Sequence, residues 1–148
     1  MKKIIALLAV LFLLQSVALA DPDLQTYNFF ASTYGAPTID ESSLIENTSQ
    51  RVTYRQGKTT LAFAAVNSLE INSAFVVSEP DGDFLPTCVA AAMTLNPSSE
   101  NTTSSLGFLL YAYLMIKNGE ESYMGFFGGL VFTMKKDGDR FQFAIGKV

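Results

Sequence analysis

Two long apolar runs near the end of the chain restrict its fold more than any other feature. Residues 105–116 read SLGFLLYAYLMI and residues 122–134 read SYMGFFGGLVFTM, and neither run contains a charged side chain. Asn118-Gly119 separates the two runs and Asp137-Gly138 follows the second, and both dipeptides are typical of tight hairpin turns. Together with the final run FQFAIGKV, this pattern predicts an antiparallel meander of three long strands.

Successive side chains of a strand point to opposite faces, which assigns the faces of this meander. In the last strand Phe141, Phe143 and Ile145 share one face, while polar or small residues occupy the other. The two earlier strands are apolar on both faces. One face of each can pack on the core, so the second face needs a cover of its own.

Three covers are compatible with this pattern. The first is the chain's own N-terminal helix, lying across a sheet that bends at Gly125, Gly128 and Gly129, because glycine inside a strand often marks a bend. The second is lipid, as in a small outer-membrane barrel, although the strands of such barrels alternate apolar with polar residues. The third is another secreted protein or a second copy of the chain.

The first part of the chain predicts helices. Apolar residues at three- and four-residue steps favour a helix over residues 21–34, which Gly35 and Pro37 end. A second short helix is predicted over residues 40–46.

The middle of the chain predicts strands and turns. From residue 51 onward, the sequence predicts two strands joined by a tight hairpin turn at Gln56-Gly57. Residues 69–77 are predicted to form a further strand, and residues 79–83 a turn. Residues 60–69 and 84–95 fit either a helix or a strand.

These elements define an α+β fold. A short N-terminal helical segment packs on a curved antiparallel sheet that ends in the three-strand meander, with the shape of a cone or half-barrel. An all-β barrel is the alternative.

The first twenty residues have the pattern of a secretory signal peptide. Lys2 and Lys3 precede an apolar run, and Ala18-Leu19-Ala20 forms a small-residue cleavage site. We therefore expect a single domain over residues 21–148, secreted or periplasmic, with no transmembrane span. Two of the ten basic residues leave with the leader and all fourteen acids stay, so the mature formal charge is −6. An acidic chain without a basic cluster is not expected to bind nucleic acid.

The chain lacks most catalytic and metal-binding side chains. It has no histidine, and Cys88 is its one cysteine. The Ser-His-Asp and Cys-His mechanisms and the common zinc sites are thereby excluded within one chain. The acids that flank Gly82 and Gly138 have the composition of ordinary turns. We expect no metal and no cofactor.

The sequence therefore favours a non-catalytic binding domain for an apolar small molecule or a secreted protein partner, with a homodimer as one form of the latter. The candidate ligand-binding residues lie on the two apolar runs and are Tyr111, Tyr113, Met115, Tyr123 and Phe127. The enzymatic alternative is an isomerase or hydrolase that uses a pocket carboxylate, such as Glu70, with a tyrosine. The small outer-membrane barrel is the second alternative.

Overall fold

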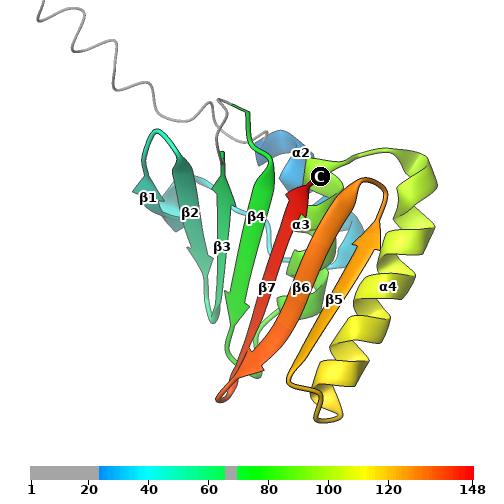
Figure 1. The fold of residues 1–148 in the computed structure, drawn as a ribbon. Helices are drawn as coiled ribbons and strands as arrows, with labels where there is room; N and C mark the ends of the chain where they lie inside the picture. The colour runs from blue at the N-terminus through cyan, green and yellow to red at the C-terminus, as the bar shows by residue number, and fades with distance from the viewer. Residues whose placement is uncertain (1–23, 66–69) are drawn as a thin grey trace, which may run out of the picture.

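The computed structural model describes residues 24–65 and 70–148, with the side chains of residues 99–104 left out (Figure 1). One seven-stranded antiparallel sheet in the order β1-β2-β3-β4-β7-β6-β5 forms the framework. Its strands are β1 Leu44–Asn47, β2 Arg51–Gln56, β3 Thr59–Ala64, β4 Ser73–Ser78, β5 Ser122–Phe127, β6 Leu130–Asp137 and β7 Arg140–Lys147. The helices are α2 Leu24–Tyr34, α3 Phe84–Leu95 and α4 Ser99–Lys117, and a 3-10 turn η1 spans Glu41–Ser43.

The three helices pack on one face of the sheet. Each is joined to it by an aromatic ring pair: Tyr27 of α2 with Phe63 of β3, Phe84 of α3 with Phe141 of β7, and Phe108 of α4 with Phe127 of β5. The sheet is open, with β1 and β5 at its edges. The predicted α+β fold, with a helix packed on an antiparallel sheet, is confirmed, and the alternative of an all-β barrel is wrong.

α3 is the central helix of the core. It packs against α2 and α4 on its sides and against β4 and β7 beneath it. Its middle consists of small residues, Ala90, Ala91 and Ala92, which are fully buried and let the helix approach the sheet closely. Pro86 lies in the first turn, where a missing N–H costs no helical hydrogen bond. The segment 84–95, for which the sequence allowed either state, is therefore a helix.

The prediction of a strand over residues 105–116 is wrong, because this segment belongs to α4. A run that is apolar at nearly every position satisfies any periodicity, so alternation carried no information here. Its leucines, alanine and methionine are strong helix formers, whereas Ile116 is its one β-branched residue. Asn118-Gly119 ends the helix instead of turning a hairpin, with Gly119 at φ 112°.

The prediction of one strand over residues 122–134 is also wrong, because the segment is a hairpin. Gly128 and Gly129 form its two-residue turn with φ values of 53° and 73°, a conformation that glycine adopts without strain. The terminal meander therefore exists as β5-β6-β7. Its second turn, at Gly138, was predicted correctly.

The remaining predictions are partly confirmed. The helix over 21–34 appears as α2, and the Gln56-Gly57 hairpin joins β2 to β3. The short helix over 40–46 shrinks to η1, after which the chain enters β1. The strand over 69–77 begins only at Ser73. The predicted leader over 1–20 and residues 66–69 lie outside the described residues.

Candidate functional site

No described helix covers the face of the sheet that points away from α2, α3 and α4 (Figure 1). Its side chains follow from strand register, because residues paired directly across strands share a face. One such row crosses six strands and consists of Thr53, Ala62, Phe75, Ala144, Thr133 and Met124. Phe75 is 41% exposed and stands among small neighbours.

Two hollows on this face meet at Phe75. The larger has a volume of about 430 Å³ and is lined, beside Phe75, by Glu46, Thr48, Gln50, Arg51, Ala64 and Ala65. The smaller has a volume of about 240 Å³ and lies toward β6 and β7, where Val131, Thr133, Ala144 and Gly146 contribute to it. Phe75 is thus the shared wall of two adjacent depressions.

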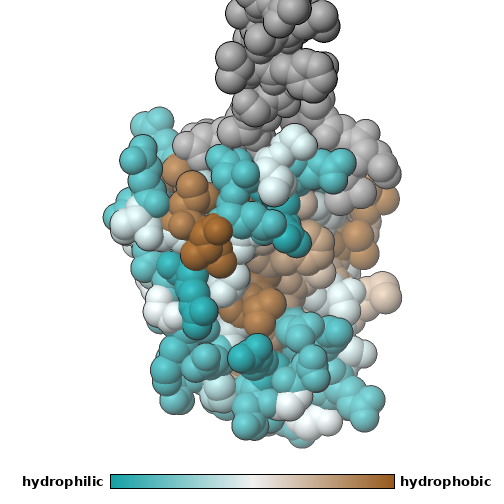
Figure 2. Space-filling view, turned by 90° about the vertical axis from the view of Figure 1, so that its left-hand side faces the viewer, coloured by the Kyte–Doolittle hydropathy of each residue, from teal (hydrophilic) through white to brown (hydrophobic). Residues whose placement is uncertain are grey.

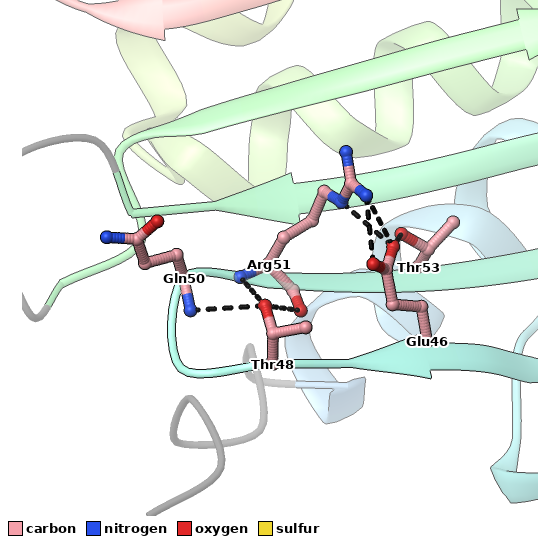
Figure 3. Close-up of polar contacts among 5 residues, drawn as sticks. All are labelled: Glu46, Thr48, Gln50, Arg51 and Thr53. Carbon is pink, nitrogen blue, oxygen red and sulfur yellow. Dashed lines mark hydrogen bonds and ion pairs between the residues drawn. The ribbon is translucent and has the colours of Figure 1, made fainter.

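The rim of the larger hollow is a polar cluster at the β1–β2 hairpin (Figure 3). The Arg51 guanidinium donates to both carboxylate oxygens of Glu46, with Nε–Oε2 and Nη2–Oε1 distances of 2.9 Å each. Thr53 Oγ1 donates to the same carboxylate at 3.2 Å, because Glu46 and Thr53 are paired across the two strands. The register irregularity between Leu44 and Glu46 lies at this point.

The hairpin turn itself is held by Thr48 (Figure 3). Its hydroxyl accepts from the backbone N–H of Arg51 at 3.0 Å and donates to the Arg51 carbonyl at 3.1 Å. The Gln50 N–H donates to the same hydroxyl at 3.3 Å. These bonds order the backbone from which the Arg51 side chain extends.

The ion pair sets the charge state of the rim. The hydrogen bonds from Arg51 lower the pKa of the Glu46 carboxyl, and the same contacts raise the pKa of Arg51. Both side chains are therefore charged at neutral pH, and together they present a paired cation and anion to the hollow.

The side of the molecule at the β1 edge is mixed in hydropathy, with hydrophobic residues showing between hydrophilic ones (Figure 2).

The five predicted site residues lie elsewhere, on α4 and β5. Tyr111 contacts Tyr123 edge-on at 5.6 Å between ring centroids, and Phe127 stacks on Phe108 at 6.3 Å. Tyr113 packs against the rings of Phe84 and Phe141.

Tyr111, Tyr123 and Phe127 thus take part in ring contacts between α4 and β5, whereas Tyr113 contacts α3 and β7. Met115 is half-buried on α4. None of the five lines either hollow at Phe75. Their assignment as ligand-binding residues stays a prediction.

Phe75 was not predicted as a site residue. It lies on the face opposite to Ala74 and Val76, which are fully buried. The segment SAFVVS carries one serine and two apolar residues on each face, so the sequence does not distinguish the buried face of this strand from the exposed one.

The acidic side chains whose burial is described are exposed or half-buried, and Glu70 is exposed in the bend before β4. Tyr27 and Cys88 are buried titratable groups on the helix side of the sheet, and burial raises the pKa of each. Within residues 24–65 and 70–148, acids and cysteine do not gather in groups of three that would suit a metal ion.

Comparison of the chain with protein-family models, curated proteins and solved structures finds no match. Among the helices that the structure describes, none combines the length and apolar character needed to cross a bilayer.

Proposed function

We propose that the protein is a non-catalytic secreted or periplasmic binding protein. Its ligand is an apolar small molecule with one polar end, bound on the open sheet face at Phe75. The observation that carries the proposal is the larger hollow, which joins an exposed aromatic wall to a paired polar rim. Its volume of about 430 Å³ falls within the range of small-molecule sites, which runs from about 300 to about 1,000 Å³.

The lining suggests how such a molecule lies. Ala64 and Ala65 form a flat floor beside Phe75, against which an acyl chain or ring can pack. Covering the exposed part of Phe75 contributes about 1 kcal/mol to binding, since full burial of a phenylalanine contributes about 1.5–3 kcal/mol. The polar end reaches Arg51, whose planar guanidinium suits a carboxylate.

Binding of a fluorescent fatty-acid analogue to the mature protein, residues 21–148, tests this proposal. We expect saturable binding and a rise in melting temperature. Phe75→Ser should weaken binding at least about fivefold, because it removes the apolar wall of the hollow. Phe29→Ser is the matched control, since Phe29 is 67% exposed on α2 and lines neither hollow.

A second pair of probes tests the polar end. Arg51→Gln should weaken the binding of a fatty acid more than the binding of the corresponding fatty alcohol, because only the acid carries the charge that the guanidinium recognises. Absence of binding and of any melting shift across the probe panel would contradict the proposed function.

A further inference from the structure

The outer surface of α4 is apolar, which is unusual for a helix that faces water. Five large apolar side chains are 42–52% exposed on this helix, namely Leu106, Phe108, Leu110, Tyr111 and Leu114. The sequence has no charged residue between positions 101 and 116. Solvent-facing helices normally place charged and polar residues on the side opposite the core.

The core side of α4 is apolar as well. Leu109, Ala112 and Ile116 are buried against the rest of the domain and recur at three- and four-residue steps. Over residues 106–116 the helix is therefore apolar around its circumference, but the described part of the domain covers only one side of it. A helix of this composition is stable in water when its second side is also buried.

We propose that the outer face of α4 is the interface of a homodimer. In this dimer the α4 helices of two copies pack antiparallel across a two-fold axis that passes between Leu110 and Tyr111. The surface is then its own partner, as an isologous interface requires.

Gly107 and Leu114 supply the self-complementary contact. They lie seven residues apart on one face of the helix and equally far from the proposed axis, so each faces the other residue on the second copy. A Cβ added at Gly107 would meet nothing within 4 Å, which leaves open space above the backbone. Leu114 of the second copy fills that space, and symmetry makes the same contact twice.

The available area and charge fit this occupant. The five exposed side chains offer about 450 Å² per copy, or about 900 Å² per pair, close to the ~1,000 Å² that a specific interface needs. Gly107 and the half-buried Met115 add to this area. The middle of the surface has no charge, so two copies meet there without repulsion.

A membrane surface fits the same helix less well. Helices that lie on bilayers combine an apolar face with a face rich in lysine and arginine. α4 carries Lys117 as its one basic residue, and the whole chain has a formal charge of −4. Anionic lipid would therefore repel the domain.

Sedimentation equilibrium of the mature protein is the first test. We expect a reversible dimer at micromolar concentrations. Gly107→Arg and Leu110→Glu should each raise the dimer dissociation constant at least about 30-fold, because each places an unpaired charge at the helix contact. The space above Gly107 lets the monomer accept the larger side chain, which an unchanged circular dichroism spectrum verifies. Phe29→Glu, at an exposed apolar residue of α2, should leave dimerisation unchanged.

Disulfide trapping tests the antiparallel orientation. The double variant Gly107→Cys with Leu114→Cys should form a covalent dimer under mild oxidation. Positions seven residues apart on one helix are separated by about 10.5 Å, beyond the reach of an internal disulfide. The native Cys88 is fully buried and does not compete. Ser32→Cys on α2 is the control for random cross-linking.

A wild-type protein that stays monomeric up to about 200 µM overturns the proposal, since a reversible dimer with a micromolar dissociation constant would be populated at that concentration. Monomers that float with phosphatidylcholine vesicles through α4 overturn it in favour of a membrane. The single variants Gly107→Cys and Leu114→Cys test for disulfides between identical positions of two copies. If these form, and the double variant gives no disulfide between position 107 of one copy and position 114 of the other, the antiparallel arrangement is overturned. These measurements use no ligand, so they are independent of binding at Phe75.

Discussion

At the scale of single residues, Tyr27 shows how one polar group is held inside an apolar core. Its ring contacts Phe63 at 6.0 Å between centroids, and its hydroxyl donates to the Pro37 carbonyl at 3.4 Å. The residue is 1% exposed, and desolvation is the main cause that raises its pKa above the ordinary value for tyrosine. Ionisation of Tyr27 is therefore coupled to unfolding.

This coupling predicts a loss of stability in alkali. Above the ordinary tyrosine pKa of about 10, the unfolded chain releases the Tyr27 proton while the folded protein keeps it, so the free energy of unfolding falls as pH rises. Cys88 adds a loss of the same sign. Tyr27→Phe should reduce the fall in the free energy of unfolding between about pH 8 and about pH 10.5, which urea unfolding at the two pH values measures. Tyr111→Phe, at an exposed tyrosine, should show the wild-type fall, and an equal fall in both variants would contradict the prediction.

At the scale of elements, the β5–β6 hairpin depends on a glycine that packs against an aromatic ring. Gly125 is paired with Phe132 across the two strands. A Cβ at position 125 would lie 2.5 Å from Cε1 and 2.6 Å from Cζ of that ring. Phe132 is 1% exposed and contacts the rings of Tyr123, Phe127 and Phe143, so it has little room to move.

Gly125→Ala should therefore destabilise the protein by roughly 1–3 kcal/mol, the usual cost of overpacking a close-packed core. Gly146→Ala on β7 is the matched control, because its nearest contact would be the Asn72 carbonyl oxygen at the ordinary distance of 3.6 Å. Urea unfolding of both variants measures the difference. Equal stability of the two variants would show that the Phe132 ring yields without cost.

At the scale of the whole molecule, the helices cover one face of the sheet and leave the other open. The covered face supplies the core, and the open face carries Phe75 and its two hollows. The outer side of α4 is a second apolar surface, built from a different element. The proposed ligand site and the proposed dimer interface thus use separate parts of one small domain.

The predicted leader gives a testable expectation for the whole chain. Expressed from residue 1 in a bacterium, the protein should be exported and cleaved after Ala20, so that it begins at Asp21. The intact mass of the protein in the periplasm or medium measures this. A chain that begins at Asp21 without the leader should stay in the cytoplasm, and recovery of an uncleaved full chain would contradict the prediction.

Sequence patterns predicted the structure correctly where local chemistry has one solution. The helix over residues 24–34 shows helical spacing, and Gly57 and Gly138 occupy turns with positive φ. The alternation of Phe141, Phe143 and Ile145 correctly assigned the buried face of β7. The strand prediction failed at residues 105–116, because a run that is apolar at nearly every position suits a buried strand and a helix equally.

The sequence alone predicted the α+β class, with an all-β barrel as the alternative, together with the turns at Gly57 and Gly138, the acidic charge and the lack of histidine chemistry. The folded structure was needed to show that α3 and α4 are helices and that Gly128-Gly129 turns a hairpin. It alone also brought Phe75 beside the Glu46–Arg51 pair. The physical reason is that propensities and turn signals act over a few neighbouring residues. The state of a uniformly apolar segment, and the meeting of β1, β2 and β4 side chains, depend instead on which surfaces are buried together.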